Sequence, residues 1–150
     1  MNAKIYSINI SAKKKIPKAS IDSAEVIENF GLKGDAHAGD ATRQVSLLAI
    51  ESINRQAESV KVPGGAHELK AGDFAENITT MGIELSKLKI GDRLKLGGSV
   101  ILEISRIGKE CHERCEVYYR TGACIMPREG MFAKVLKGGR IVTGDPIGVE

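Results

Sequence analysis

Residues 93–106 read Arg-Leu-Lys-Leu-Gly-Gly-Ser-Val-Ile-Leu-Glu-Ile-Ser-Arg, and this stretch decides the fold class. Apolar residues occupy alternate positions on both sides of the central Gly97-Gly98 pair. A period of two places such side chains on one face of a β-strand. A glycine pair between two alternating runs supplies the backbone angles of a tight turn. The stretch therefore predicts a β-hairpin with one buried face.

Similar short apolar runs, separated by turn signals, occur along the rest of the chain. The chain has 17 glycines, many of them in Gly-Asp or Gly-Gly pairs between these runs. We expect the last Gly-Gly pair, at 138–139, to join two strands in a second hairpin. Many short strands with frequent turns are typical of an all-β barrel or sandwich. The predicted strands outside the first hairpin are the run through Tyr6, Ile8 and Ile10, residues 44–48, residues 132–136, residues 140–142 and residues 147–149.

Helical periodicity is restricted to two segments. Ala49–Val60 carries apolar residues at spacings of three and four, which predicts an amphipathic helix. Cys111–Arg120 predicts a second, less regular helix. Residues 61–72 are expected to form an exposed loop. With 150 residues, 42% apolar and 27% charged, the chain is expected to form a single domain over residues 1–150.

Charge and cysteine content narrow the class of protein. The net charge is +3, and residues 1–20 hold five lysines and no acidic residue. We interpret the cluster of four lysines between residues 13 and 18 as a solvated loop. We expect no nucleic-acid partner, although a nucleic-acid-binding barrel is an alternative. No apolar run approaches the ~20 residues of a membrane span, and no secretory signal is evident. An odd number of cysteines, three, fits a reducing compartment, so the expected location is the cytoplasm.

The three cysteines lie close together in the sequence. Residues 109–115 read Lys-Glu-Cys-His-Glu-Arg-Cys, and Cys124 follows. If Cys111 opens a helix, unpaired backbone N–H groups and the positive end of the helix dipole face its sulfur. The basic residues Lys109, His112 and Arg114 also favour the thiolate, which is the nucleophile and the metal ligand. Cys111 is therefore the candidate reactive cysteine, with Cys115 one helical turn away.

Other readings of the cysteine cluster stay open. The three cysteines with His112 have the right atoms for zinc, which would make the chain a non-catalytic metal-binding module. Their spacing, Cys-x3-Cys-x8-Cys, is not a usual zinc pattern, and an iron–sulfur cluster would lack a fourth cysteine. An inert buried thiol is the plainer explanation for Cys124, which precedes Ile125 and Met126.

The glycine-rich segment 31–40 is a second candidate site. Lys33 and His37, with Arg43 beyond the segment, could bind a phosphate or another anion. Asp35 could orient His37 or a ligand amide. A polar, turn-rich loop with a solvated histidine would explain the same residues.

Two further polar residues complete the set of candidates. Asn77 lies in the strand-like run 72–80, where its amide could either bind the edge of a heterocycle or cap the backbone. Arg128 lies in a turn before the next strand and could bind an anion.

Taken together, these segments resemble the MOSC family, which is named for the C-terminal domain of molybdenum cofactor sulfurase. The resemblance spans about residues 4–148, with the motifs in order, and fits the short stand-alone prokaryotic type. The matching stretches are Gly31-Leu-Lys-Gly-Asp-Ala-His37, Arg43-Gln-Val-Ser46, Gly72-Asp-Phe-Ala-Glu-Asn-Ile-Thr-Thr80, Leu88-Lys-Ile-Gly-Asp92, Gly108-Lys-Glu-Cys-His112, Glu129-Gly-Met-Phe-Ala-Lys-Val-Leu136 and Gly144-Asp145.

The resemblance implies a mostly β fold: a distorted, largely antiparallel β-barrel with a few short helices, similar to the β-barrel domain of pyruvate kinase. It also implies one central cysteine, which matches Cys111. The family is thought to carry sulfur as a persulfide, or to bind the molybdenum–pterin cofactor through that cysteine. Cys115 and Cys124 go beyond the general family pattern, which leaves open whether one thiol or a set of thiols acts.

These observations lead to one preferred hypothesis, a sulfur carrier or molybdopterin-binding domain. Cys111 would accept sulfur from a pyridoxal-phosphate-dependent cysteine desulfurase, or coordinate molybdenum. The acceptors would be proteins of molybdenum cofactor biosynthesis or molybdoenzymes. We expect a carrier rather than an autonomous redox enzyme; an enzymatic role would be that of a sulfur transferase. The residues expected to bind the cofactor are Lys33, Asp35, His37, Arg43, Asn77, Lys109, His112 and Arg128.

Overall fold

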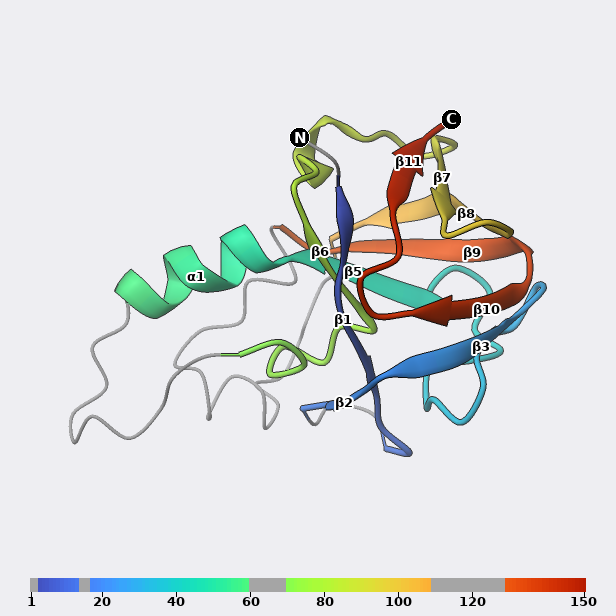
Figure 1. The fold of residues 1–150 in the computed structure, drawn as a ribbon, viewed down its shortest axis with the longest axis horizontal. Coiled ribbons are helices and arrows are strands. Elements are labelled where there is room, and N and C mark those ends of the chain that lie inside the picture. Colours follow the sequence, from blue (N-terminus) through green and yellow to red (C-terminus); the bar gives the residue numbers. More distant parts are fainter. Residues whose placement is uncertain (1–2, 14–16, 60–69, 109–128) are drawn as a thin grey trace.

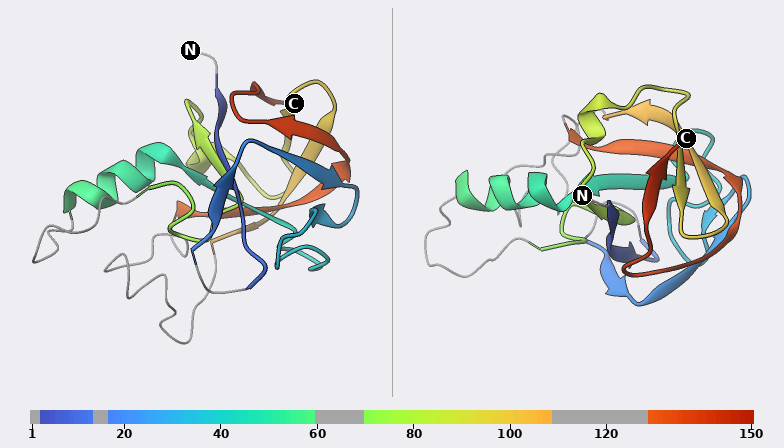
Figure 2. Two further views of the ribbon diagram at one scale, coloured as in Figure 1. Left: turned by 60° about the horizontal axis from the view of Figure 1, so that its bottom comes forward. Right: turned by 45° about the horizontal axis from the view of Figure 1, so that its top comes forward.

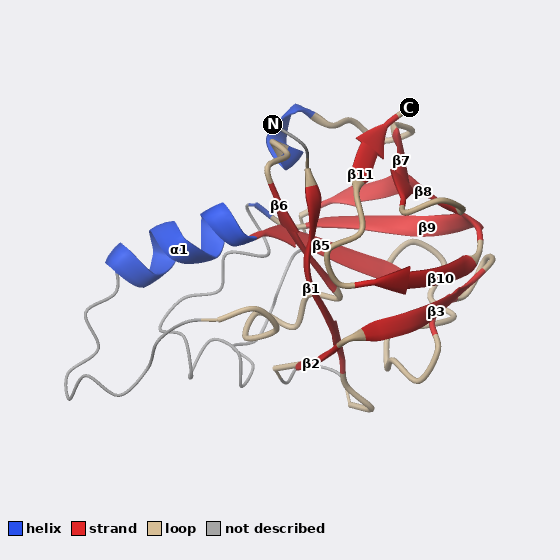
Figure 3. Ribbon diagram, in the orientation of Figure 1, coloured by secondary structure: helices blue, strands red, loops and turns tan. Residues whose placement is uncertain are grey.

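β-Strands dominate the fold, and helix α1 (Ile50–Ser59) projects from an end of the sheet (Figures 1 and 3). The structure is a computed structural model that describes residues 3–13, 17–59, 70–108 and 129–150. The elements follow in the order β1 (Lys4–Ile10), β2 (Ala19–Ile21), β3 (Ser23–Ile27), β4 (Gly31–Leu32), β5 (Val45–Ala49), α1 (Ile50–Ser59), β6 (Ile78–Met81), the 3-10 helix η1 (Leu85–Lys87), β7 (Arg93–Leu96), β8 (Val100–Ile107), β9 (Met131–Lys137), β10 (Gly139–Val142) and β11 (Ile147–Val149).

The strands form a large curled sheet and a small one. The large sheet has eight strands in the order β11-β7-β8-β9-β5-β6-β1-β2, and the small sheet has the order β10-β3-β4. Main-chain hydrogen bonds from Ile5 to Asp145 (2.9 Å) and from Ile147 to Ala3 (3.0 Å) join β1 to the chain around β11. The large sheet therefore curls back on itself (Figure 2). Among the described strand pairs only β5–β6 is parallel, which confirms the expected mostly β, largely antiparallel fold.

The hairpin predicted over residues 93–106 is present as β7 and β8. Leu94 pairs with Leu102, and Leu96 pairs with Val100. All four side chains are almost fully buried in the main core. Because each buried aliphatic side chain contributes about 1.5–3 kcal/mol, this alternation is enough to fix the register of the hairpin. The strands predicted around residues 44–48 and over 147–149 are also confirmed, as β5 and β11.

The second predicted hairpin is wrong. β9 pairs with β8 and β5 in the large sheet, whereas β10 pairs with β3 in the small sheet. The chain thus crosses between sheets at Gly138-Gly139, and neither glycine has a positive φ. A Cβ on Gly138 would lie 2.5 Å from the Val26 carbonyl oxygen, and one on Gly139 would collide with the Ser99 hydroxyl. These glycines allow close passage of the chain past its neighbours rather than a tight turn.

A register irregularity in β1 changes which of its side chains are buried. The pairing of β1 with β6 shifts between Ile5 and Ser7. Ile5 and Ile8 are consequently both fully buried, whereas Tyr6 is 43% exposed. The alternation of Tyr6 and Ile8 predicts the strand correctly but not the orientation of Tyr6, because a bulge reverses the faces partway along the strand.

Helix α1 follows β5 without an intervening loop and agrees with the predicted helix over residues 49–60. Ile50 and Ile53, three residues apart, are buried in a second apolar cluster, which also contains Phe74 and Phe132. This cluster fixes α1 to the start of β9 and to the turn before β6. None of the helices in the described ranges is long and apolar enough to cross a bilayer. The predicted helix Cys111–Arg120 and most of the predicted loop 61–72 lie outside the described residues.

We expect Gly138→Ala to destabilise the protein because its new Cβ would overlap the Val26 carbonyl oxygen. The free energy of unfolding should fall by about 1–3 kcal/mol, the usual cost of overpacking. Gly98→Ala is the matched control, since a Cβ at Gly98 meets nothing within 4 Å. Urea denaturation of both variants tests the expectation, and equal stability of the two would contradict it.

Candidate functional site

Five of the predicted site residues lie in the described part of the chain: Lys33, Asp35, His37, Arg43 and Asn77. The structure brings Asp35, His37 and Asn77 together and leaves the other two apart. The predicted residues Lys109, Cys111, His112, Arg114, Cys115, Cys124 and Arg128 lie outside the described residues.

Asp35 is the centre of a buried charged cluster. Its Oδ1 accepts hydrogen bonds from Nζ of Lys18 (2.7 Å) and from the backbone N–H of Ser11 (3.1 Å). Its Oδ2 accepts the backbone N–H of His37 at 3.1 Å. Nζ of Lys18 also lies 3.1 Å from Nδ1 of His37. We refer to these three residues as the Lys18–Asp35–His37 cluster.

The position of Lys18 differs from its sequence-based interpretation. The lysine-rich segment was expected to be a solvated loop, and Lys13 is exposed, but the side chains of Lys18 and Asp35 are both 0% exposed. An ammonium group can be buried here because Asp35 and His37 accept its hydrogen bonds. No local pattern distinguishes Lys18 from Lys13, since its partners lie 17 and 19 residues further along the chain.

The cluster fixes the charge of Asp35 and the orientation of the His37 ring. Burial by itself would raise the pKa of Asp35, but its polar neighbours His37, Lys18 and Asn77, together with the positive charge of Lys18, hold that pKa well below its usual range. An ammonium group has no lone pair, so Nδ1 of His37 must accept from Lys18. The neutral ring therefore carries its proton on Nε2. The His37 side chain is 17% exposed.

Both the oxygen and the nitrogen of the Asn77 side-chain amide make hydrogen bonds to neighbouring residues. Its Oδ1 accepts the backbone N–H (3.0 Å) and the hydroxyl (3.1 Å) of Ser46. Its Nδ2 donates to the carbonyl oxygen of Asn9 at 3.2 Å. The side chain is 0% exposed. Of the two roles considered for Asn77, these contacts favour the bonding of neighbouring backbone over the binding of a heterocycle.

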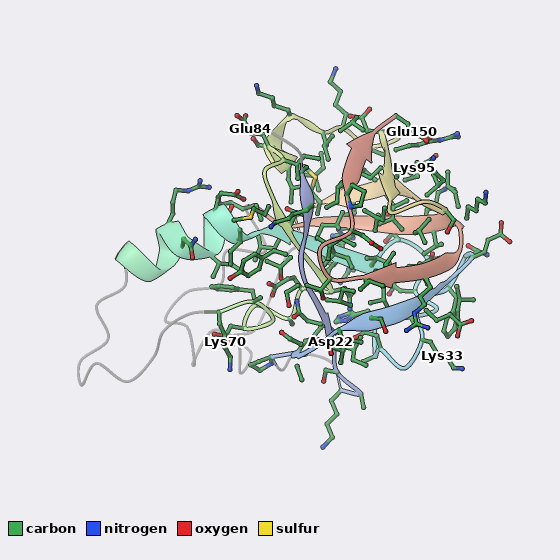
Figure 4. All side chains as sticks on the ribbon, viewed as in Figure 1. Asp22, Lys33, Lys70, Glu84, Lys95 and Glu150 are labelled. Carbon is green, nitrogen blue, oxygen red and sulfur yellow. The ribbon has the colours of Figure 1, made fainter. Side chains whose placement is uncertain are left out.

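Lys33 and Arg43 lie outside the cluster. The Lys33 side chain is 71% exposed and lies 3.7 Å from Glu25. Figure 4 shows it at the outer edge of the molecule. Arg43 is half-buried, and its backbone N–H donates to Asp40 at 3.0 Å. Of the anion-binding residues expected in segment 31–43, only His37 belongs to the buried cluster.

Glu76 is a residue of this site that sequence reasoning did not select. It is 0% exposed, and its Oε2 accepts the Gly72 backbone N–H (3.0 Å) and the Thr79 hydroxyl (2.7 Å). In the part of the chain that the structure describes, its Oε1 is buried without a hydrogen-bond partner. Desolvation by burial raises the pKa of Glu76 to about 7, although these hydrogen bonds partly oppose the shift. Two adjacent polar residues, Glu76 and Asn77, in the strand-like run 72–80 are the sequence signal that could have identified it.

A separate cavity lies at the opposite ends of β5 and β6. It has a volume of about 640 Å³ and is lined by the start of α1, the segment after β6 and residues 129–131. Its polar lining includes Ser52 and Arg55. The Arg55 guanidinium donates a hydrogen bond to Oε1 of Glu129 at 2.7 Å. None of the five described candidate residues lines it. Within the described ranges, no group of three or more His, Cys, Asp or Glu side chains is arranged to bind a metal.

Comparison with known proteins identifies a family and a fold. The family model of the MOSC domain matches residues 33–148. The YuaD protein from Bacillus subtilis has a similar structure, with a TM-score of 0.80 at 23% identity over 99% of this chain and 96% of that chain. YiiM from Geobacillus stearothermophilus has a TM-score of 0.73 at 19% identity, covering 99% and 75% of the two chains. YiiM from Escherichia coli has a TM-score of 0.69 at 18% identity, covering 99% and 68%. No curated protein matches the sequence.

Replacing Lys18 by methionine should leave the Asp35 carboxylate buried without its cation. Loss of one member of a buried ion pair costs about 3–5 kcal/mol, so Lys18→Met is expected to reduce the free energy of unfolding by that amount. Lys87→Met is the matched control because the Lys87–Glu84 pair is largely exposed, and it should change stability by less than about 0.5 kcal/mol. Chemical denaturation gives both values. A loss for Lys18→Met no larger than the control would contradict the assignment.

Burial of Glu76 should make stability depend on pH. Its pKa rises from 4.5 to about 7 on folding, so between these values the folded protein binds more protons than the unfolded chain. Stability should therefore fall by about 3 kcal/mol as the pH rises through this window, and then level off. Asp35, with its lowered pKa, acts in the opposite direction and only at lower pH, where stability is lost as the pH falls below 3.8.

Unfolding free energies measured from pH 4.5 to pH 8 test this assignment. The slope should disappear in Glu76→Gln and remain in Glu84→Gln, which removes a largely exposed carboxyl. A slope of equal size in wild type and Glu76→Gln would show that another group causes it.

Proposed function

The chain belongs to the MOSC domain family, and from this membership we propose that it is a sulfur carrier or molybdopterin-binding domain that acts through Cys111. Family membership supports the general class, a domain related to the C-terminal part of molybdenum cofactor sulfurase. The carrier role and the reactive cysteine are our proposal. They are supported by the sequence around Cys111 and by the buried cluster described above.

The observation that carries the proposal is the fully buried Lys18–Asp35 ion pair beside a partly exposed histidine. Removing two charges from water costs several kcal/mol per ion, and apolar residues of similar volume often stabilise a fold as well or better. A charge pair kept at this cost, next to a ring that can offer a hydrogen bond, is typical of a binding or catalytic site. His37 is the described residue that can offer this site to a ligand.

Cys111 is proposed to serve the same site. In the sequence it comes four residues after the end of β8, and β8 belongs to the same large sheet as β6, which begins beside Asn77.

The proposed sulfur transfer needs no external oxidant. The Cys111 thiolate attacks the outer sulfur of a persulfide on a pyridoxal-phosphate-dependent cysteine desulfurase. A new S–S bond forms on Cys111, the S–S bond of the donor breaks, and its electron pair leaves with the donor thiolate. Lys109, His112 and Arg114 favour the attacking thiolate by their positive charge. The acceptor would be a protein of molybdenum cofactor biosynthesis or a molybdoenzyme.

The described residues fit the anionic part of the molybdenum cofactor only in part. The Nε2–H of His37 can donate to a phosphate or oxo oxygen, which suits such a group. Asn77 has its amide bonded to Ser46 and Asn9, so it contributes by supporting the site rather than by touching the pterin. The bound cofactor would supply a molybdenum centre with an open position for a thiolate ligand, which Cys111 is proposed to provide.

Incubation with a cysteine desulfurase and cysteine should load one sulfur atom onto the protein. Intact-protein mass spectrometry is expected to show a gain of about 32 Da, the mass of one sulfur atom in a persulfide. Dithiothreitol should remove the added mass. Cys111→Ser should abolish the gain, because the accepting thiolate is missing.

Single variants at Cys115 and Cys124 provide the controls, since each keeps Cys111. If Cys111 alone accepts sulfur, both should retain the gain in mass. No gain in wild type, or a gain unaffected by Cys111→Ser, would contradict the carrier role. Elemental analysis of the same preparations for zinc and molybdenum distinguishes this role from a metal-binding module.

A further inference from the structure

Glu76 has no part in the proposed sulfur transfer, yet it is a fully buried carboxyl with an incomplete set of partners. Its Oε2 accepts two hydrogen bonds, from Gly72 and Thr79, whereas its Oε1 has no hydrogen-bond partner among the described residues. Ionisation leaves a buried negative charge that no cation contacts directly among the described residues. Protonation leaves a neutral acceptor, whose hydrogen bonds are about half as strong as those of a carboxylate. Either state has a cost, so the carboxyl is suited to gain or lose a proton.

Among the described residues, one connection between the carboxyl and the Lys18–Asp35–His37 cluster runs through Gly72. The Gly72 N–H donates to Glu76, and the Gly72 carbonyl oxygen accepts the Lys18 backbone N–H at 2.8 Å. Gly72 has φ +90°, and a Cβ there would collide with the Lys18 carbonyl oxygen and lie 3.4 Å from Cγ of Asn9. Gly72 therefore has little space to move without moving Lys18.

A second contact fixes the same turn from the other side. Nδ2 of Asn9 donates to the Glu76 carbonyl oxygen (3.1 Å) and to the Thr79 hydroxyl (3.0 Å). The Thr79 hydroxyl in turn donates to Oε2 of Glu76. Asn9 is itself held by the hydroxyls of Ser7 and Ser20, each 2.8 Å from its Oδ1. With the backbone of Glu76 fixed in this way, a change in its carboxyl acts mainly on Gly72.

We propose that Glu76 is a proton-sensitive positioning residue that sets the backbone position of Lys18 through Gly72, and thereby the orientation of the His37 ring. The ionised carboxylate holds Gly72 firmly, because a charged acceptor strengthens the hydrogen bond from its N–H. Protonation weakens that bond and relaxes the contact between Gly72 and Lys18. Nζ of Lys18, 3.1 Å from Nδ1 of His37, transmits the change to the ring. The inference rests on the proposed function only for the identity of the ligand that His37 binds.

The other titratable groups around Glu76 are few in the part of the chain that the structure describes. Lys18, Asp35 and His37 lie on the elements packed against the turn, and Asp73 lies in the turn itself. Oδ2 of Asp73 accepts the Lys70 backbone N–H at 2.9 Å. The pKa of Glu76, raised to about 7 by burial, places its proton exchange near neutral pH.

Nuclear magnetic resonance of the full-length, ¹⁵N-labelled chain between about pH 5.5 and 8.5 tests the proposal, a range that brackets the pKa of a buried carboxyl. We expect the amide signals of Gly72 and Lys18 to shift with a common midpoint of about 7. The ring nitrogens of His37 should show a component with the same midpoint. In Glu76→Gln these changes should disappear. In Asp73→Asn, which removes the charge of the neighbouring carboxyl, they should persist.

Each remaining outcome decides against the proposal. A Gly72 transition that persists in Glu76→Gln, or no Gly72 transition at all, would show that Glu76 does not act on this turn. A Gly72 transition without a matching change at Lys18 and His37 would show that the contact does not extend to the cluster. If Glu76→Gln fails to fold, Thr79→Val should move the midpoint upward by about 1 unit, because one hydrogen bond to the carboxylate is lost. Thr79→Ser, which keeps the hydroxyl, should leave the midpoint near its wild-type value.

These measurements are independent of sulfur loading. A protein that shows the coupled transition but gains no sulfur on Cys111 would retain the positioning role and lose the carrier role. A protein that gains sulfur but shows no coupled transition would retain the carrier role and lose the positioning role.

Discussion

The buried ion pair between Lys18 and Asp35 is the interaction on which the candidate site depends. It joins two segments that have no sheet pairing with each other, the chain before β2 and the loop after β4. Because neither charge reaches solvent, each requires the other, and the loop that carries His37 is held in one conformation. The contact with Lys18 also gives the neutral ring a defined tautomer, with its proton on Nε2. A looser, solvated pair at the surface would hold neither the loop nor the ring.

The surrounding sheet explains how such a pair can be kept. Asn9 on β1 and Asn77 before β6 exchange hydrogen bonds across the two strands: the Asn9 N–H donates to the Asn77 carbonyl oxygen (2.7 Å), and the Asn77 amide donates to the Asn9 carbonyl oxygen. This polar layer lies at one end of β6, and the apolar cluster beneath α1 covers the sheet nearby. Buried polar groups are tolerated here because nearly every donor and acceptor has a partner. The unpartnered oxygen of Glu76 is an exception and is therefore the group most open to a change of protonation.

Local sequence predicted those parts of the fold whose partners are close in the chain. The hairpin over residues 93–106 combines an alternating pattern with a short turn, and both halves are neighbours in sequence and in space. The same logic failed at Gly138-Gly139, where the following strand pairs with β3, more than 100 residues earlier in the chain. A glycine pair signals either a tight turn or a close approach of two backbones, and the sequence does not distinguish them. The bulge in β1 likewise cannot be predicted from local sequence, because it depends on the pairing of β1 with β6.

The sequence by itself determined the family and the mostly β architecture, and it selected Asp35 and His37 as candidates, because motif and alternation are properties of neighbouring residues. Tertiary structure alone decided that Lys18 leaves the exposed lysine-rich segment to neutralise Asp35, and that Glu76 lies buried behind Gly72. Charge burial is a property of the whole packed environment. Whether a lysine or glutamate is solvated or enclosed depends on residues that are distant in the chain and adjacent only after folding.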